Sequence, residues 1–152
     1  MQKEILQQTK IGYNIARAGI LSKLHAIQTL SAHSCQITPE QYTVLEVLVN
    51  HGAVYQRQIS ALTMKDRGNI TRILNILENL GCITKQADAN GRKIYKIYLT
   101  EKGKKIYEET KPVILQTWED CITGLSEEEL LLCSKLLDKV TENLKAKVNI
   151  QI

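Results

Sequence analysis

The chain has 152 residues, a formal net charge of +4, four cysteines and no phenylalanine. This length suits one domain with helical extensions, and no apolar run approaches the roughly 20 residues that cross a bilayer. The polar start, Met1-Gln-Lys-Glu4, is not typical of a signal peptide. We therefore expect a soluble cytoplasmic protein without a membrane partner.

The positive charge is concentrated in the middle of the chain. Residues 56–111 hold twelve Lys or Arg against six Asp or Glu, a balance of +6, whereas residues 112–152 hold four against seven, a balance of −3. This asymmetry predicts a basic surface on the middle segment, which suits a polyanionic partner such as double-stranded DNA.

The first predicted element is a long helix over residues 3–34. This segment lacks proline, and its apolar residues recur at helical intervals, although Gly12 or Gly19 could interrupt it. At about 1.5 Å per residue such a helix outreaches a small globular core. Part of its apolar face is therefore expected to pack against another subunit.

A strong helix start follows at Thr38-Pro-Glu-Gln41, with Thr38 as the N-cap and Gln41 completing a capping box. This helix is predicted to end at His51-Gly52, where glycine can adopt the left-handed cap. Residues 53–55 could pair as a small strand. A short helix over 56–63 and a second over 66–81 then have the layout of a helix-turn-helix.

The helix over residues 66–81 has two different faces when its residues are placed at 100° intervals. Alone, this pattern is typical of an ordinary amphipathic surface helix. Its polar arc nevertheless offers Arg and Asn, which can make paired hydrogen bonds to guanine and adenine edges. The apolar arc comprises Ile70, Ile73, Leu74, Ile76, Leu77 and Leu80, and the polar arc comprises Gly68, Thr71, Arg72, Asn75 and Asn79.

A β-hairpin is predicted next. Residues 82–87 and 92–99 flank Asp88-Ala-Asn-Gly91, and the Asn-Gly pair is a strong hairpin signal. A hairpin directly after a helix-turn-helix is a wing. Two helices complete the chain, one capped by Thr100 with a bend expected at Pro112, the other opened by a capping box at Ser126-Glu-Glu-Glu129.

Five short stretches, in the order of these elements, resemble the MarR family of winged-helix transcriptional regulators across essentially the whole chain. They are Leu45-Glu-Val-Leu48, Ile70-Thr-Arg72, Leu77-Glu-Asn-Leu-Gly81, Asp88-Ala-Asn-Gly-Arg92 and Leu99-Thr-Glu-Lys-Gly103. The fold class is therefore expected to be mainly α with a small β-hairpin (α+β). A winged helix-turn-helix DNA-binding region over 38–100 would be flanked by a helical dimerisation region formed by 1–37 and 101–152.

The resemblance also implies a function. The chain is expected to be a homodimer that binds pseudo-palindromic operator DNA, usually as a repressor released by a small-molecule ligand or by oxidation. Gly68 departs from the family pattern, which usually has Ser or Thr near this position. The residues that would contact DNA, by match to the family, are Gln56, Arg57, Arg67, Asn69, Thr71, Arg72, Asn75, Arg92 and Lys93.

Different roles are expected within this set. Arg72 and Asn75 would contact bases, whereas Arg67 and Asn69 would place the helix on phosphates. Arg92 matches the family's wing-tip arginine, which enters the adjacent minor groove.

A ligand pocket is expected between the dimerisation helices and the winged unit. Its candidate residues are Tyr13, Arg17, Tyr42 and Trp118, although Tyr and Trp are equally good interface anchors.

Other functions remain as alternatives. A thiol-based redox sensor would use Cys35, which a loop could expose. A helical protein-interaction module, an anti-repressor with the same fold, is disfavoured by the basic middle segment. An enzyme is not predicted because the chain has no Gly-rich phosphate loop, metalloprotease motif or nucleophile elbow. The cysteines form no Cys-x-x-Cys pair and the histidines no pair at ligand spacing, so no metal or other cofactor is expected.

Overall fold

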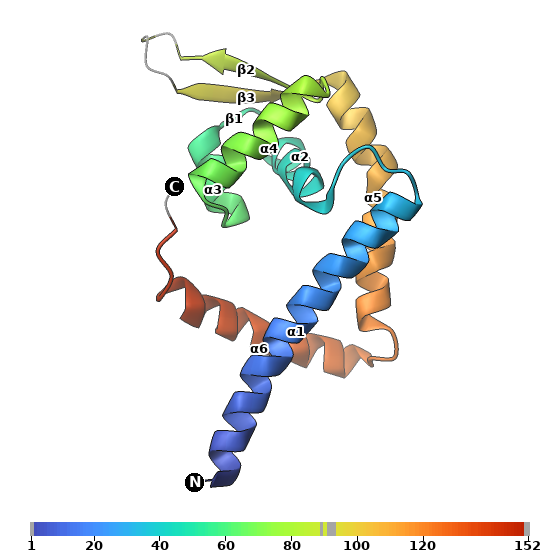
Figure 1. The fold of residues 1–152 in the computed structure, drawn as a ribbon, viewed down its shortest axis with the longest axis vertical. Coiled ribbons are helices and arrows are strands. Elements are labelled where there is room, and N and C mark those ends of the chain that lie inside the picture. Colours follow the sequence, from blue (N-terminus) through green and yellow to red (C-terminus); the bar gives the residue numbers. More distant parts are fainter. Residues whose placement is uncertain (1, 89, 91–93, 151–152) are drawn as a thin grey trace.

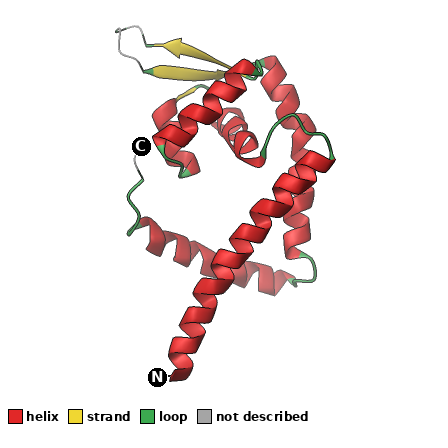
Figure 2. Cartoon of the chain, viewed as in Figure 1, coloured by secondary structure: helices red, strands yellow, loops and turns green. Residues whose placement is uncertain are grey.

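The structure is a computed structural model that describes residues 2–88, 90 and 94–150. It is mainly helical, with a small antiparallel sheet at one end (Figures 1 and 2), and the predicted fold class is confirmed. No helix among the described residues is both long and apolar enough to cross a membrane. The elements are α1 (Gln2–Ala32), α2 (Pro39–His51), β1 (Val54–Tyr55), α3 (Gln56–Thr63), α4 (Arg67–Asn79), β2 (Ile83–Ala87), β3 (Tyr95–Leu99), α5 (Glu101–Ile122) and α6 (Glu127–Lys145).

The helix starts follow from local hydrogen bonds at the predicted caps. Thr38 and Gln41 form the expected capping box on α2, with bonds of 3.3 Å from the Gln41 amide to Thr38 Oγ1 and 3.0 Å from the Thr38 amide to Gln41 Oε1. Thr100 Oγ1 accepts from the Gly103 amide at 3.0 Å, and Ser126 caps α6 with a second capping box. These caps satisfy amides that the first helical turn leaves unpaired.

Several predicted boundaries differ by a few residues from the observed ones. The helix predicted over 66–81 is α4, which runs from Arg67 to Asn79. Helix α1 is continuous through Gly12 and Gly19, and neither glycine has a positive φ. It ends at Ala32, two residues before the approximate end predicted at residue 34. Its end is fixed by a turn in which Ser34 has a φ of 54° and the Cys35 amide donates to the Leu30 carbonyl. Strand β3 begins at Tyr95 and not at residue 92, and β2 begins at Ile83 and not at residue 82. Pro112 lies inside α5, which continues through it as one helix.

The sheet has the strand order β1-β3-β2, with both pairs antiparallel. In the hairpin Ile83 pairs with Leu99 and Ala87 with Tyr95, while β1 pairs Val54 with Ile97. The predicted hairpin and the predicted short strand are both present. The hairpin tip, which includes Gly91, Arg92 and Lys93, lies outside the described residues.

The core lies where α2, α3 and α4 meet β3 and the first half of α5. At its centre Tyr42 of α2, which is 2% exposed, stacks on Tyr107 of α5 with ring centroids 5.0 Å apart. Burial, together with the neighbouring Tyr107 and Glu46, raises the pKa of Tyr42 well above its ordinary range. The core residues include Tyr42, Val44, Leu45, Leu48, Ile59, Ile70, Ile73, Leu74, Leu77, Ile83, Ile97, Ile106, Tyr107 and Ile114.

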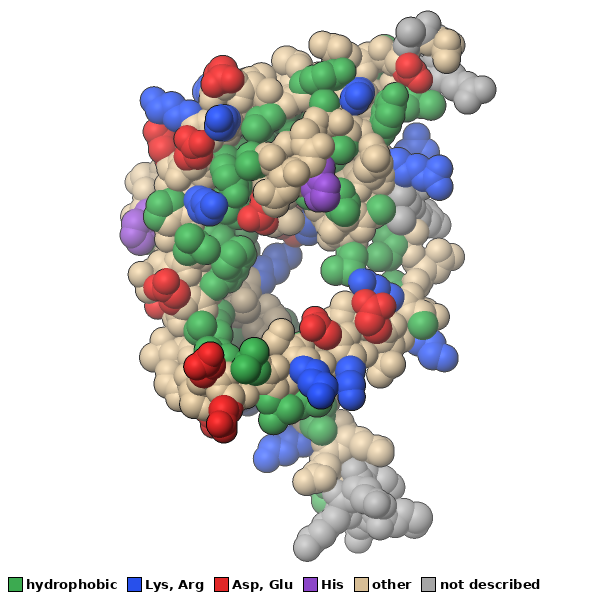
Figure 3. All heavy atoms as spheres, turned by 180° about the vertical axis from the view of Figure 1, so that it is seen from behind, with side chains coloured by type: hydrophobic (Ala, Val, Ile, Leu, Met, Phe, Trp, Pro, Cys, Tyr) green, Lys and Arg blue, Asp and Glu red, His purple; other side chains and the backbone are tan. Residues whose placement is uncertain are grey.

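The terminal helices, by contrast, leave most of their apolar side chains uncovered. No residue of α6 is buried, and among the described side chains of α1 only Leu30 is. Seen from behind, Figure 3 shows an opening between α6 and the winged unit, with hydrophobic side chains along the edge formed by α5. The exposed large apolar residues of these helices include Leu6, Ile11, Tyr13, Ile20, Leu21, Leu24, Trp118, Ile122, Leu131, Leu132, Leu136, Leu137 and Leu144.

Candidate nucleic-acid interface

Helix α4 lies at the surface of the winged unit with the two faces that its sequence predicts. Ile70, Ile73, Leu74 and Leu77 are buried, and Ile76 and Leu80 are half-buried. The opposite face is exposed at Gly68, Thr71, Arg72, Asn75 and Asn79. No described part of the chain covers this polar face, which leaves it free to enter a major groove.

The start of α4 is held by the carboxylate of Asp66. Asp66 Oδ1 accepts a hydrogen bond of 2.9 Å from the Asn69 amide, so the cap comes from Asp66 and requires no Ser or Thr at position 68. A Cβ on Gly68 would lie 3.3 Å from the same Oδ1, a tight contact. The departure from the family pattern at Gly68 is thus compatible with a well-formed helix start.

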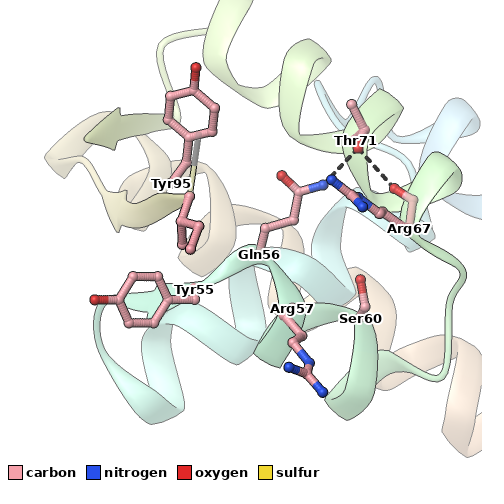
Figure 4. A pocket seen from close by; sticks show the side chains of 8 residues that line it. Tyr55, Gln56, Arg57, Ser60, Arg67, Thr71 and Tyr95 are labelled. Atoms are coloured by element: carbon pink, nitrogen blue, oxygen red, sulfur yellow. Dashed lines mark hydrogen bonds between the residues drawn. The ribbon is translucent and has the colours of Figure 1, made fainter. Parts of the chain in front are cut away.

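A chain of hydrogen bonds joins α3 to α4. Gln56 Nε2 donates to Thr71 Oγ1 at 2.6 Å, and Thr71 Oγ1 donates in turn to the Arg67 carbonyl at 2.8 Å (Figure 4). Gln56 opens α3, and Thr71 lies on the exposed face of α4. Two predicted site residues from different helices are therefore in direct contact.

A cleft of about 540 Å³ opens between α3, α4 and the start of β3. Figure 4 shows Gln56 and Ser60 on one side of it, Arg67 and Thr71 on another, and Tyr55 and Tyr95 at its far end. Ser60 Oγ is a buried hydroxyl without a hydrogen-bond partner among the described residues. The full lining is Tyr55, Gln56, Arg57, Ser60, Arg67, Thr71, Ile94 and Tyr95. Two guanidinium groups and several polar groups make this cleft suited to a phosphodiester backbone.

The two residues predicted to read bases both have partners that the sequence did not indicate. Arg72 Nη2 donates to Asn69 Oδ1 at 3.0 Å and lies 3.7 Å from Glu40 Oε2. Asn75 Oδ1 accepts from Lys85 Nζ of β2 at 2.6 Å. Lys85 also lies 3.7 Å from Glu78 Oε1, so the edge of the reading face is a small network of charges.

The described part of the wing adds further cationic and aromatic groups. Lys96 Nζ of β3 lies 5.8 Å from the ring centre of Tyr55 and 6.0 Å from that of Tyr98. Four neighbours of the site were not predicted: Tyr55, Lys85, Tyr95 and Lys96. Lys85, Tyr95 and Lys96 lie within a few positions of the predicted wing tip, and this nearness could have indicated them; Tyr55, in β1, had no such signal. Arg92 and Lys93 lie outside the described residues.

Of the four candidate ligand residues, Tyr13 and Arg17 contact each other, whereas Tyr42 lies apart from them in the core. Tyr42 is buried against Tyr107 in the core. Tyr13 is exposed on α1 with the Arg17 guanidinium carbon 5.5 Å from its ring centre, and Trp118 is half exposed on α5. Tyr42 thus contributes to packing, and the other three lie on faces that a second subunit could reach.

Two of the four cysteines are at least partly buried, and the described residues show no metal site. Cys35 is half-buried against the core, and burial raises the pKa of its thiol above the ordinary value. The pKa of Cys82 is raised by burial too, although Lys102 opposes the shift. Cys121 and Cys133 are exposed. In the described part of the chain no cluster of three His, Cys, Asp or Glu side chains could hold a metal ion.

The geometry defines a winged-helix DNA-binding unit: a capped helix with a free polar face, a cationic cleft beside it and an antiparallel hairpin. Residues 36–94 match the model of the MarR family. The chain is 30% identical to the uncharacterized HTH-type transcriptional regulator YybA of Bacillus subtilis (strain 168) over 131 residues, which cover 86% of this chain and 84% of that protein. The chain therefore belongs to the MarR family, as a DNA-binding transcriptional regulator.

Solved structures show the same fold. A structure of Bordetella bronchiseptica BpsR, described as regulated in its DNA binding by 6-hydroxynicotinic acid, matches with a TM-score of 0.80 and 23% identity over 87% of this chain and 98% of that one. A cysteine-to-serine mutant of E. coli MarR in complex with operator DNA matches with a TM-score of 0.78 and 21% identity, covering 88% of this chain and 95% of that one.

Proposed function

We propose that this protein is a homodimeric repressor that occupies a pseudo-palindromic operator and is released by a small-molecule ligand. The observation that carries the DNA-binding part is the exposed polar face of α4 beside the cleft that contains Arg57 and Arg67. In this proposal residues 38–100 form the DNA-binding region, and residues 1–37 and 101–152 form the dimerisation region.

The proposed contacts divide by chemistry. Arg72 and Asn75 read bases in the major groove, where their side chains can each make paired hydrogen bonds. A second group contacts phosphates and sets the register: Gln56, Arg57, Arg67, Asn69 and Thr71. At the wing, Arg92 enters the minor groove with Lys93 beside it, as the family resemblance implies.

The uncovered apolar faces of α1, α5 and α6 support the homodimer. A large exposed apolar area on a single chain indicates an interaction surface, and two copies related by a two-fold axis would present two α4 helices to successive major grooves about 34 to 36 Å apart. A ligand bound between these helices and the winged unit would change that spacing. The coupling required is about 1 to 3 kcal/mol, and Tyr13, Arg17 and Trp118 are the proposed pocket residues, whereas Tyr42 is buried in the core.

The two alternatives gain less support. An anti-repressor has no need of the cationic cleft beside α4. A redox sensor requires a thiolate, and burial of Cys35 disfavours that form.

Fluorescence anisotropy with the DNA upstream of the protein's own gene, repeated across a salt series, tests the proposal. Several phosphate contacts should make the affinity fall steeply with salt. If the protein does not bind this DNA, or if its affinity does not change with salt concentration, the proposed repressor function is wrong. Addition of candidate aromatic ligands to the complex then tests release, and Arg92→Ala should weaken binding on A·T-rich flanks.

A further inference from the structure

One carboxylate lies among cations from three parts of the fold. Glu40 is in the first turn of α2, and its side chain is 28% exposed. Its Oε1 accepts hydrogen bonds from Lys65 Nζ at 3.2 Å and from Lys23 Nζ of α1 at 3.4 Å. Its Oε2 lies 3.7 Å from Arg72 Nη2 on the exposed face of α4.

Glu40 is ionised and held in place by these neighbours. Partial burial opposes its ionisation, but the hydrogen bonds and positive charges of Lys65 and Lys23 outweigh that effect and lower the pKa of Glu40 below its ordinary value. Lys65 is itself partly buried, with a side chain 20% exposed, and it lies in the connection between α3 and α4. The carboxylate is therefore a fixed negative charge next to the reading helix.

One nitrogen of Arg72 has two oxygen neighbours. Nη2 donates a hydrogen bond to Asn69 Oδ1 at 3.0 Å and forms an ion pair with Glu40 Oε2 at 3.7 Å, while the Arg72 side chain is 63% exposed. An arginine reads guanine through two parallel N–H groups, so the plane of its guanidinium decides which base edge it meets. Contacts that fix this plane before DNA arrives reduce the conformational entropy lost on binding.

We propose that Glu40 is a specificity-determining positioning residue, which holds the Arg72 guanidinium in its base-reading orientation from outside the reading helix. The inference rests on the proposed DNA-reading role of α4. A carboxylate beside a DNA surface repels phosphates whatever the sequence, so Glu40 weakens binding to every DNA while improving the fit of Arg72 to one base pair. Its effect is on discrimination between sequences and not on affinity alone.

The substitution Glu40→Gln tests this role, because it keeps the shape of the side chain and removes the charge. Dissociation constants are measured for the upstream DNA and for a scrambled duplex of the same length and composition at one salt concentration. The dissociation constant for the scrambled duplex divided by that for the upstream DNA should fall by about fivefold, because the variant binds the scrambled duplex more tightly. A ratio that does not change would overturn the proposal.

A matched control separates positioning from charge. Glu108→Gln removes the same charge from an exposed position on α5, so it should shift both dissociation constants together and leave the ratio unchanged. A double-mutant cycle of Glu40→Gln with Arg72→Ala adds the decisive comparison, because the Glu40 effect on the ratio should vanish once Arg72 is absent. An effect that persists without Arg72 would assign Glu40 to general folding and overturn the proposal.

A measurement without DNA makes failure of this inference distinguishable from failure of the proposed function. Nitrogen-15 relaxation at Arg72 Nε in the free protein should show a more mobile side chain in Glu40→Gln than in the wild type. Unchanged mobility would overturn positioning by Glu40. A wild-type protein that does not distinguish upstream from scrambled DNA would instead overturn the repressor and, with it, the specificity role.

Discussion

Gln56 Nε2 donates a hydrogen bond of 2.6 Å to Thr71 Oγ1, and this contact joins the first residue of α3 to the exposed face of α4. It fixes one helix of the proposed reading unit against the other at the point where both face the cleft. Loss of this contact should therefore affect DNA binding more than folding.

The substitution Thr71→Val keeps the shape of the side chain and removes this bond. We expect the dissociation constant for operator DNA to rise about two- to thirteenfold, as for a lost hydrogen bond of about 0.5 to 1.5 kcal/mol. Anisotropy measures this, and circular dichroism should show nearly the same thermal midpoint. Thr123→Val, at the far end of α5, is the control and should leave binding unchanged. A large drop in the midpoint for Thr71→Val would contradict a role confined to the interface.

Arg72→Ala and Arg57→Ala should weaken binding in different ways. Loss of Arg72, the proposed base contact, should raise the operator dissociation constant by the equivalent of about 1 to 3 kcal/mol and relax specificity at one base pair. Loss of Arg57, a proposed phosphate contact, should weaken binding evenly across sequences and reduce the salt slope by about 1. A binding-site selection with each variant makes the comparison. Identical sequence preferences for the two variants would refute the division of roles.

Leu137→Glu should disrupt the proposed dimer. Leu137 of α6 and Leu62 of α3 are both 49% exposed in the single chain, so a Glu at either position meets similar surroundings in a monomer. At position 137 the new carboxylate would be buried and unpaired in the proposed subunit interface, which destabilises the dimer. Leu62 belongs to α3 and not to the terminal helices, so Leu62→Glu should leave the dimer intact. Sedimentation velocity at micromolar concentration should report a monomer for the first variant and a dimer for the second. A monomeric wild type would exclude the homodimer itself.

Gly103→Ala should destabilise the fold at the start of α5. A Cβ there would overlap the Cys82 carbonyl oxygen and lie 2.9 Å from both the Cys82 carbonyl carbon and Leu99 Cδ1. Overpacking against backbone should reduce the free energy of unfolding by about 1 to 3 kcal/mol or more. Gly19→Ala, where a Cβ meets nothing within 4 Å, should instead be stabilising by about 0.5 to 1 kcal/mol. Urea unfolding at one protein concentration compares them, and equal effects would contradict the packing at Gly103.

Cys35 should react slowly with alkylating agents. Burial raises the pKa of its thiol, so the thiolate fraction at neutral pH is smaller than for a free cysteine, and the rate should rise only as the pH exceeds the usual thiol range. Iodoacetamide labelling followed by mass spectrometry measures this against a cysteine-containing peptide. Hydrogen peroxide at low concentration should also leave DNA affinity unchanged. Fast labelling of Cys35 with loss of binding would favour the redox alternative.

Local signals in the sequence predicted most of the elements. Thr38, Thr100 and Ser126 cap their helices as predicted, because a cap depends on residues within three positions. Asp66 was predicted as the first residue of its helix, and the structure shows it as the N-cap of α4. Both faces of α4 followed from helical periodicity. The continuity of α1 through Gly12 and Gly19 was left open, because a glycine weakens a helix without necessarily ending it.

Contacts between distant residues were not predictable. Lys23, Lys65 and Arg72 meet at Glu40 although they are 17, 25 and 32 positions away from it in the chain, and no pattern within a single element indicates such a meeting. Tyr42 was expected in a ligand pocket, but the structure places it in the core, where it stacks on Tyr107. An aromatic residue on an inward helix face fits either environment, and only the arrangement of α2 and α5 decides between them.

Helix α6 has nineteen residues and none of them is buried in the single chain. Most of the stability of a helix in a protein comes from the packing of its apolar face, so in the proposed dimer the order of α6 depends on the second copy. Dilution would then loosen α6 before the winged unit, and a protease would cleave a lone subunit at its C-terminal end first. The cellular concentration of the protein would in this way set its lifetime, since scarce copies would be degraded faster than abundant ones.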